Sequence, residues 1–403
     1  MSRNRPYTRL ATVGTALSLL AALGVTAASA EPAPAPSALR DVVLVGNSVS
    51  GTVTFLDGRT FANLGSFNVI PDLQQRLDEM NPIEKIAYAE VRRQTGGDRF
   101  ADDVSLSPDG RRLYVSRGNL NDAVAYDLAT GAQLWRFKTE GFKADHAVLS
   151  PDGTRFVVSA TTAEKAQVLD TATGTLVANV PTGAYPHAND YSADGTKIYN
   201  ASIGNVSLPK ALNFLKGKKQ LTVIDARTFQ VIRTYQLPYG IRPAVVTPDD
   251  KTMYAQLSYL NGFIEYDLTT GRTVRTVTMP YSEAGRALNP DSYPRNSAHH
   301  GMAMSGDGGR LCDIGTIDDY TAIIARPALT TSGFVHYAPG TLPYWATTSA
   351  DGRYCLVSLS NVDAISVVDY ASATEVARVT VGDFPQRTRL GKAAPEALAH
   401  LTG

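Results

Sequence analysis

Residues 101–116, ADDVSLSPDGRRLYVS, contain the pattern that decides the fold. A short apolar stretch, a Ser-Pro-Asp-Gly turn and a second stretch rich in β-branched and aromatic residues predict two antiparallel strands joined by a tight hairpin. The pattern returns at a spacing of roughly 40 residues, which is typical of repeat architectures. Five further copies follow: ADHAVLSPDGTRFVVS (144–159), PHANDYSADGTKIYNAS (186–202), RPAVVTPDDKTMYAQLS (242–258), HGMAMSGDGGRLCDIG (300–315) and PYWATTSADGRYCLVSLS (343–360).

A second hairpin follows most of these copies. AVAYDLATGAQLWRF (123–137) and AQVLDTATGTLVANV (166–180) show the same alternation around a turn rich in Thr and Gly. Two hairpins give four strands in each repeat. Four antiparallel strands form one blade of a β-propeller, so the sequence predicts an all-β fold.

The two ends of the chain complement each other. Residues 41–69 match only the second to fourth strands of a blade, and VGDFPQRTRLG (381–391) matches only a first strand. Joining them completes a seventh blade and removes two exposed sheet edges. We therefore expect a single seven-bladed β-propeller over residues 41–391, closed by a C-terminal strand that completes the N-terminal blade, with a helical insert on its top face.

The segments outside this region have different compositions. Residues 1–30 combine three arginines, an apolar run and the Ala28-Ser-Ala30 cleavage pattern of a secretory signal peptide of the Sec type. Residues 31–40 form a Pro/Ala-rich linker. Residues 392–403 read as a C-terminal tail expected to be mobile. We expect a secreted or extracytoplasmic protein with no transmembrane segment in the mature chain.

Charge and cysteine content exclude several functions. The chain has 38 basic and 38 acidic residues, which gives no long-range attraction to nucleic acid. It has only two cysteines, Cys312 and Cys355. Their number excludes a cysteine-based zinc cluster, and their spacing excludes a C-x-x-C-H motif for covalent haem. They form either a disulfide between neighbouring blades or two small buried hydrophobic side chains.

The segments LSPDGRRLYVSRGNLNDAVAYDLATGAQ (106–133) and TSADGRYCLVSLSNVDAISVVDYASATEV (348–376) resemble the YVTN-type propeller repeat. That superfamily includes surface-layer-like proteins, lactonase-like enzymes and the haem d1 domain. The resemblance covers most of residues 41–391 and implies a propeller. It implies no single function, because the matching residues belong to turns and core.

The predicted channel mouth carries the candidate site. In a propeller, the first strand of each blade lines the channel. Alignment on the Ser or Thr of each turn, with the last strand aligned by its position, places a polar residue at one level in all seven blades: Asp102, Asp145, His187, Arg242, His300, Tyr344 and Gln386. The next residues inward include His146, Trp345 and Arg387. Three inserts, at 70–97, 204–220 and 281–297, all leave the same face and are expected to form the walls of a pocket.

Several roles remain open for these residues. His187, His300 and His146 are candidate acid/base catalysts, and together with Asp102 and Asp145 they are candidate ligands of a divalent metal. The alternative is a polar rim whose residues form hydrogen bonds with water and neighbouring backbone. Arg242 and Arg387 either bind an anionic group of a ligand or pair with Asp102 or Asp145. The remaining candidate ligand contacts are Tyr344, Trp345 and Gln386, of which the two aromatic residues pack in the core as readily.

The other histidines have weaker signals. His299 is expected on the loop before a first strand, His336 on an outer strand and His400 in the tail. The sequence therefore favours a binding or scaffold protein for a small molecule, a divalent metal or a cell-surface partner. The alternative is a propeller enzyme in which a metal held by His and Asp assists a lyase, isomerase or lactone hydrolase reaction.

Overall fold

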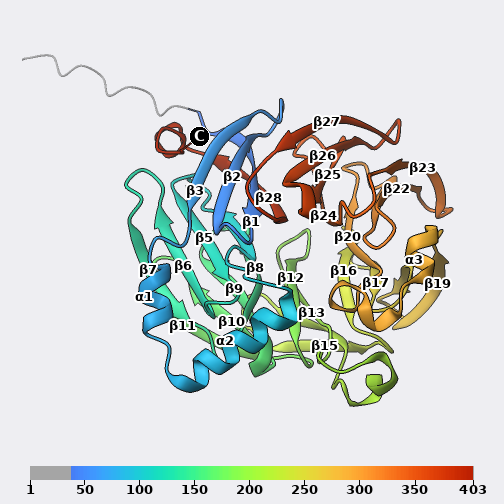
Figure 1. The fold of residues 1–403 in the computed structure, drawn as a ribbon, viewed down its shortest axis with the longest axis horizontal. Helices are drawn as coiled ribbons and strands as arrows, with labels where there is room; N and C mark the ends of the chain where they lie inside the picture. The colour runs from blue at the N-terminus through green and yellow to red at the C-terminus, as the bar shows by residue number, and fades with distance from the viewer. Residues whose placement is uncertain (1–37, 403) are drawn as a thin grey trace, which may run out of the picture. The chain divides into compact units, whose positions relative to one another are not determined.

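The computed structural model describes residues 38–402, which fold into seven four-stranded antiparallel sheets arranged as blades around a ring (Figure 1). The predicted all-β, seven-bladed fold is confirmed. Residues 1–37, which contain the predicted signal peptide and most of the predicted linker, lie outside the described residues.

Six blades are continuous in sequence, each with its first strand innermost. Their strands are β4 (Asp103–Leu106), β5 (Arg112–Arg117), β6 (Asp122–Asp127) and β7 (Gln133–Lys138); β8 (Ala144–Leu149), β9 (Arg155–Ala160), β10 (Lys165–Asp170) and β11 (Leu176–Pro181); β12 (Pro186–Tyr191), β13 (Lys197–Ser202), β14 (Gln220–Asp225) and β15 (Val231–Gln236); β16 (Ile241–Val246), β17 (Thr252–Leu257), β18 (Gly262–Asp267) and β19 (Arg272–Thr278); β20 (His299–Met304), β21 (Arg310–Gly315), β22 (Tyr320–Ala325) and β23 (Thr330–His336); β24 (Pro343–Thr348), β25 (Tyr354–Leu359), β26 (Ala364–Asp369) and β27 (Thr374–Thr380).

The seventh blade closes the ring. The C-terminal strand β28 (Pro385–Ala393) pairs with β1 (Arg40–Asn47), which continues to β2 (Thr52–Asp57) and β3 (Asn63–Asn68). Val43 lies opposite Leu390 in this register. The strand order confirms that the two incomplete ends of the repeat form one sheet.

The hairpins of the repeats have similar geometry because of their Ser-x-Asp-Gly turns. In the turn of β8 and β9, the Ser150 hydroxyl donates to Asp152 Oδ1 at 2.6 Å and accepts from the Arg155 N–H at 2.9 Å. Gly153 has a φ of 74°, a conformation that glycine adopts without steric cost. The repeated motif therefore determines the turn locally in each blade.

The cysteines settle one of the open alternatives. Cys312 on β21 and Cys355 on β25 form a disulfide with a Cα–Cα distance of 6.4 Å. Both residues are fully buried. The disulfide links two neighbouring blades through their shared apolar core.

The inserts carry the helices. The first holds α1 (Leu73–Asp78) and α2 (Pro82–Thr95), and α2 begins with a capping box between Asn81 and Glu84. The other inserts hold a 3₁₀ segment (Lys210–Leu215) and α3 (Glu283–Ala287) with two short 3₁₀ turns (Pro290–Ser292 and Pro294–Asn296). Two more 3₁₀ turns, Thr161–Ala163 and Ser360–Val362, follow β9 and β25. No helix in residues 38–402 is long and apolar enough to cross a bilayer.

The C-terminal segment packs against the first blade. Helix α4 (Pro395–Leu398) buries Ala397, and the Ser66 N–H donates to the Thr402 carbonyl at 2.7 Å. These contacts hold residues 392–402 on the propeller, although the sequence suggested a mobile tail. The reason is that Leu398 and Leu401 cover apolar core next to β3.

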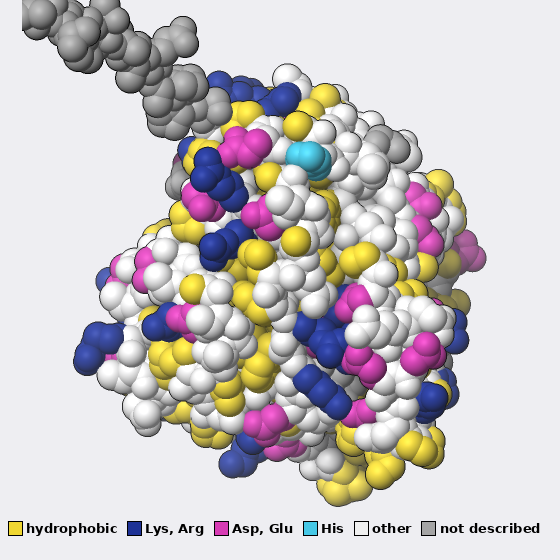
Figure 2. Space-filling model, turned by 90° about the vertical axis from the view of Figure 1, so that its left-hand side faces the viewer, with side chains coloured by type: hydrophobic (Ala, Val, Ile, Leu, Met, Phe, Trp, Pro, Cys, Tyr) yellow, Lys and Arg dark blue, Asp and Glu magenta, His cyan; other side chains and the backbone are white. Residues whose placement is uncertain are grey.

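Charges of both signs share the outer surface. On the side at the left of Figure 1, Lys and Arg side chains lie close to Asp and Glu side chains (Figure 2). Residues 38–402 contain many such pairs, for example Arg40 with Asp57 at 2.7 Å and Arg155 with Asp170 at 3.0 Å. Exposed pairs of this kind contribute little to stability but keep the local charge balanced.

Candidate functional site

A cavity lies at the channel mouth and has room of about 50 Å³ for water-sized molecules. All three inserts reach it: α2 contributes Val91, Gln94 and Thr95, the second insert Val206 and the third Arg295. This confirms that the inserts form walls of one pocket. The space holds a few water molecules or one small ligand.

The aligned rim residues surround this cavity. All seven are nearly inaccessible to solvent, and five of them line the cavity: Asp102, Asp145, His187, Arg242 and Gln386. His146, one position further along β8, lines it as well. His300 and Tyr344 stack on each other with ring centroids 4.0 Å apart.

Three imidazoles from different blades meet here. The ring centroids of His146 and His187 are 4.3 Å apart, and those of His187 and His300 are 5.7 Å apart. Each Nδ1 lies near an oxygen: the Asp102 carbonyl at 3.1 Å for His146, Asp145 Oδ2 at 3.2 Å for His187 and the Tyr344 carbonyl at 2.9 Å for His300. Each Nε2 is buried without a hydrogen-bond partner among residues 38–402.

The anchored Nδ1 atoms define the tautomers. When Nδ1 donates to an oxygen, the lone pair of a neutral imidazole lies on Nε2. This applies to His187 and His300. His146 Nδ1 instead accepts a hydrogen bond from Arg387 Nε at 2.9 Å, so its neutral ring carries the proton on Nε2. The Nε2 lone pairs of His187 and His300 remain available to an incoming group.

Burial keeps these rings neutral. It lowers the pKa of His146 well below the usual range, and repulsion from Arg387 adds to this effect. Burial also lowers the pKa of His300, helped by His187, and the pKa of His187, where Asp145 partly opposes it. Neutral imidazole is the form that coordinates metal ions and accepts protons.

Asp145 lies beside the histidines, but its carboxylate already has ion-pair and hydrogen-bond partners. Its oxygens lie 3.1 Å from Lys143 Nζ, 3.2 Å from His187 Nδ1 and 3.2 Å from Thr161 Oγ1. Burial alone raises the pKa of this carboxyl, but Lys143 and the two imidazoles outweigh burial and hold it well below the usual value. Potential ligand atoms of Asp145, His146 and His187 lie within 4.8 Å of one another. The carboxylate nevertheless serves first as the anchor of His187.

Asp102 has a similar role. Its Oδ2 lies 3.0 Å from Lys143 Nζ, so one ammonium group bridges two rim carboxylates. Its backbone carbonyl lies 3.1 Å from His146 Nδ1. Asp102 therefore contacts a ring of the cluster, and its role as a direct metal ligand stays a prediction.

The two predicted arginines differ in role. Arg242 lines the cavity and pairs with neither Asp102 nor Asp145; its Nε donates to Ser258 Oγ at 3.1 Å. Arg387 pairs with Asp103 instead, and its guanidinium lies 3.5 Å from the ring centroid of Trp345. Arg242 thus faces ligand space, whereas Arg387 belongs to the layer beneath it.

The aromatic candidates support the site from behind. Tyr344 is 1% and Trp345 6% exposed, and neither lines the cavity. Tyr344 packs on His300 and receives a hydrogen bond from Arg295 at 2.7 Å. The Trp345 ring packs against the guanidinium of Arg387. The core alternative therefore describes Tyr344, whereas Trp345 lines a separate cavity of about 350 Å³.

One expected position was wrong. His299 is the first residue of β20, fully buried, with Nδ1 3.0 Å from Asp313 Oδ2. The strand begins one residue earlier than expected, so the side chain packs against Asp313 and Tyr320 of its own blade instead of lying on a loop. His336 ends the outer strand β23 and is exposed, as predicted, and His400 is exposed beside α4.

Sequence reasoning missed Arg99, Lys143 and Arg295, which also line the cavity. Arg99 follows the first insert, Lys143 precedes β8 and Arg295 ends the third insert. Their common signal is a cationic residue where an irregular segment meets a first strand. Alignment of the repeats does not detect it, because these positions lie outside the repeat.

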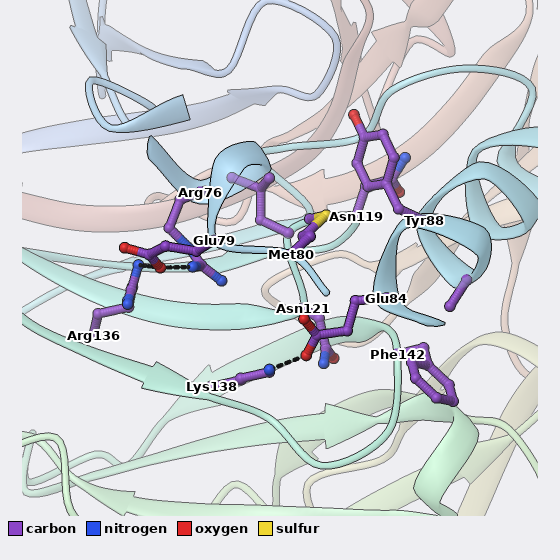
Figure 3. A pocket seen from close by; sticks show the side chains of 12 residues that line it. Arg76, Glu79, Met80, Glu84, Tyr88, Asn119, Asn121, Arg136, Lys138 and Phe142 are labelled. Carbon is purple, nitrogen blue, oxygen red and sulfur yellow. Dashed lines mark hydrogen bonds and ion pairs between the residues drawn. The ribbon is translucent and has the colours of Figure 1, made fainter. Parts of the chain in front are cut away.

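Another cavity, of about 120 Å³, lies between the helical insert and the outer part of the blade of β4–β7 (Figure 3). Its charged side chains are paired: Glu79 with Arg136 at 3.1 Å, Glu84 with Lys138, and Arg76 with Asp122 at 3.0 Å. These contacts attach the insert to the blade. The channel mouth, with its unpartnered imidazoles, is therefore the better candidate site.

Comparison with known proteins supports the fold. A family model described as outer membrane protein assembly factor BamB matches residues 93–277. No curated protein matches the chain. A solved structure of Kuenenia stuttgartiensis hydrazine synthase is 16% identical with a TM-score of 0.56, covering 73% of this chain and 96% of that one. Dihydro-heme d1 dehydrogenase NirN in complex with DHE is also 16% identical with a TM-score of 0.53, covering 86% of this chain and 74% of that one.

These similarities establish architecture only. At 16% identity a shared propeller says nothing about the ligand. Both structural matches agree with the overall fold described above. The chain is a seven-bladed β-propeller with a group of histidine ligand atoms at its channel mouth.

Proposed function

We propose that this chain is an exported binding protein that holds a divalent metal ion at the channel mouth, through Nε2 of His187 and His300, with His146 and Asp145 beside them. One observation carries the proposal: the buried, neutral imidazoles of His187 and His300 are each anchored through Nδ1, and each leaves Nε2 without a partner among the described residues. Buried polar atoms usually have partners, so two such atoms in one cluster favour a missing ligand.

The chemistry of the donors suits a first-row transition metal. Imidazole nitrogen binds Zn²⁺, Cu²⁺, Ni²⁺ and Fe²⁺, and a backbone carbonyl or carboxylate on the other ring nitrogen is the usual support. Two histidine ligands leave coordination positions open to a small molecule. The proposed site is thus a metal that presents a free position to a small molecule.

The metal content of the purified protein tests this proposal. After treatment with a chelator and reconstitution with Zn²⁺, we expect about one equivalent by elemental analysis, and much less in the His187→Ala and His300→Ala variants. His336→Ala is the matched control, because His336 is an exposed histidine on an outer strand. A wild-type protein that takes up no metal, or variants that bind as much as His336→Ala, would refute the metal site. Circular dichroism verifies that each variant is folded.

We also propose that the chain is exported and that it is related to the YVTN-type propellers. The composition of residues 1–30 supports cleavage after Ala30. N-terminal sequencing of the protein recovered outside the cytoplasm tests it. Intact Met1 on protein confined to the cytoplasm would contradict export.

A further inference from the structure

Three arginines on the cavity wall lack acidic partners. Arg99 lies between α2 and β4, Arg242 on β16 and Arg295 in the third insert. Their side-chain hydrogen-bond acceptors within residues 38–402 are all neutral: the carbonyls of Asp98, Thr95 and Arg295 and the hydroxyls of Ser258 and Tyr344. Arg99 Nε is buried without a hydrogen-bond partner among the described residues, and its guanidinium lies 4.0 Å from the ring centroid of Phe384.

The cavity as a whole has excess positive charge. Its lining contains four cationic side chains, these three arginines and Lys143, against the two carboxylates Asp102 and Asp145. Both carboxylates bind Lys143. The three guanidinium groups are therefore not neutralised by the lining residues.

Burial makes this arrangement costly. Arg99 and Arg242 are 4% and 1% exposed, respectively. Burial lowers the pKa of each to about 10, and Arg295 adds repulsion in both cases. Both groups therefore stay charged at neutral pH. Buried charges are normally paired, and a bound anion would supply the missing partner.

The backbone directs Arg295 to this place. Arg295 and Asn296 have φ values of 49° and 65°, an uncommon conformation for two successive residues other than glycine. Arg295 Nη1 donates to the Tyr344 hydroxyl at 2.7 Å and Nη2 to the Thr95 carbonyl at 3.2 Å. Arg242 in turn donates to the Arg295 carbonyl. The third insert is thus fixed with its guanidinium against the first insert and Tyr344.

We infer that the cavity binds a small oxyanion, the carboxylate or phosphate group of a ligand, on Arg99, Arg242 and Arg295. This deepens the proposed function, because it assigns a ligand class to the cavity beside the histidines, but it does not require the metal. The available space of about 50 Å³ limits the enclosed part to a compact group. Guanidinium is suited to this task, since its planar N–H groups match two oxygens of a carboxylate or phosphate.

Thermal unfolding and calorimetry of the metal-free protein test the inference. Acetate, oxalate, phosphate and sulfate are each titrated at constant ionic strength against a chloride background. We expect at least one of them to raise Tm saturably and to give a measurable heat of binding. The anion that acts distinguishes a carboxylate from a phosphate-type ligand. If none acts beyond chloride, the inference is overturned.

Variants locate the effect. Arg295→Gln, at a partly exposed position, and Arg242→Gln should each weaken anion binding at least tenfold. Arg353→Gln is the control, because Arg353 is an exposed arginine after the turn of β24 and β25 and should bind like the wild type. If Arg242→Gln does not fold, Arg295→Gln still decides. Equal binding by Arg295→Gln and Arg353→Gln would overturn the site.

Metal uptake separates this inference from the proposed function. Arg295→Gln should still take up Zn²⁺ when it no longer binds the anion. Anion binding by a wild-type protein that takes up no metal would refute the metal proposal and support the anion site. Metal uptake without anion binding would overturn the anion site alone.

Discussion

The interblade disulfide offers a prediction with a magnitude set by the structure. Cys312 and Cys355 are separated by 43 residues. In the chain-entropy model, a cross-link closing a loop of this length stabilises the folded state by about 4 kcal/mol at 25 °C. Because an unfolding entropy of about 0.8 kcal/mol/K applies to a domain of this size, the loss corresponds to a fall in Tm of about 5 °C.

Three variants test this estimate: Cys312→Ala, Cys355→Ala and the double variant. Each removes the same bond, so each should lower the free energy of unfolding by a similar amount, and the two single effects should not add. Urea unfolding followed by tryptophan fluorescence measures the change. Thiol titration in denaturant should find no free thiol in the wild type and one in each single variant.

Two results would refute the reasoning. One is a double variant within about 1 kcal/mol of the wild type, since the cross-link would then contribute far less than loop closure predicts. The other is additivity of the single variants together with free thiols in the wild type. Metal uptake should not change in these variants, because the disulfide lies in the core between blades and away from the cavity.

Further predictions concern the turns, the rim and a glycine. The Ser192 hydroxyl and the Thr196 N–H hold the pKa of Asp194 below its ordinary value of 3.8. Because the folded-state pKa is the lower one, this stabilisation is complete above the unfolded-state value and is lost as pH falls below it. Tm should therefore decrease between pH 6 and pH 3, less steeply in Asp194→Asn; identical profiles would contradict this. Lys143→Met leaves two buried carboxylates without their cation and should lower the unfolding free energy by about 3–5 kcal/mol, part of which Asp102→Asn should restore. An unchanged unfolding free energy in Lys143→Met would show that the ammonium group does not stabilise the fold. Gly301 has a φ of 150°, and an added Cβ would lie 2.6 Å from Ile314 Cγ1. Gly301→Ala should shift β20 with His300 and reduce both Tm and metal uptake. Unchanged metal uptake would show that the position of Gly301 does not affect the histidine cluster.

The rim residues show how much of the site an alignment of the repeats can predict. The seven aligned residues are all buried, because the first strand of each blade lies at the centre of the ring. Alignment also placed His146 one step further in. It did not show that Arg387 would pair with Asp103 rather than with Asp102 or Asp145, since this depends on which side chains of neighbouring blades face each other.

The grouping of the three arginines proposed to bind an anion could not be predicted from the sequence, for a different reason. Arg295 reaches the Thr95 carbonyl, which is 200 residues away in the chain. Neither residue belongs to the repeat, and no period predicts contacts between two inserts. His299 shows the same limit on a smaller scale, because its partner Asp313 lies on the next strand and only the register brings them together.

The sequence by itself determined the propeller, the number of blades and the closure of the ring. These follow from local hydrogen bonds of the Ser-x-Asp-Gly turns, from strand alternation and from the complementary ends of the chain. Only the tertiary structure decided which rim residues are already satisfied and which are not. Lys143 pairs with both carboxylates. Within residues 38–402, three imidazole Nε2 atoms have no hydrogen-bond partner and three guanidinium groups have no acidic partner, because burial and partners are set by chain segments distant in sequence.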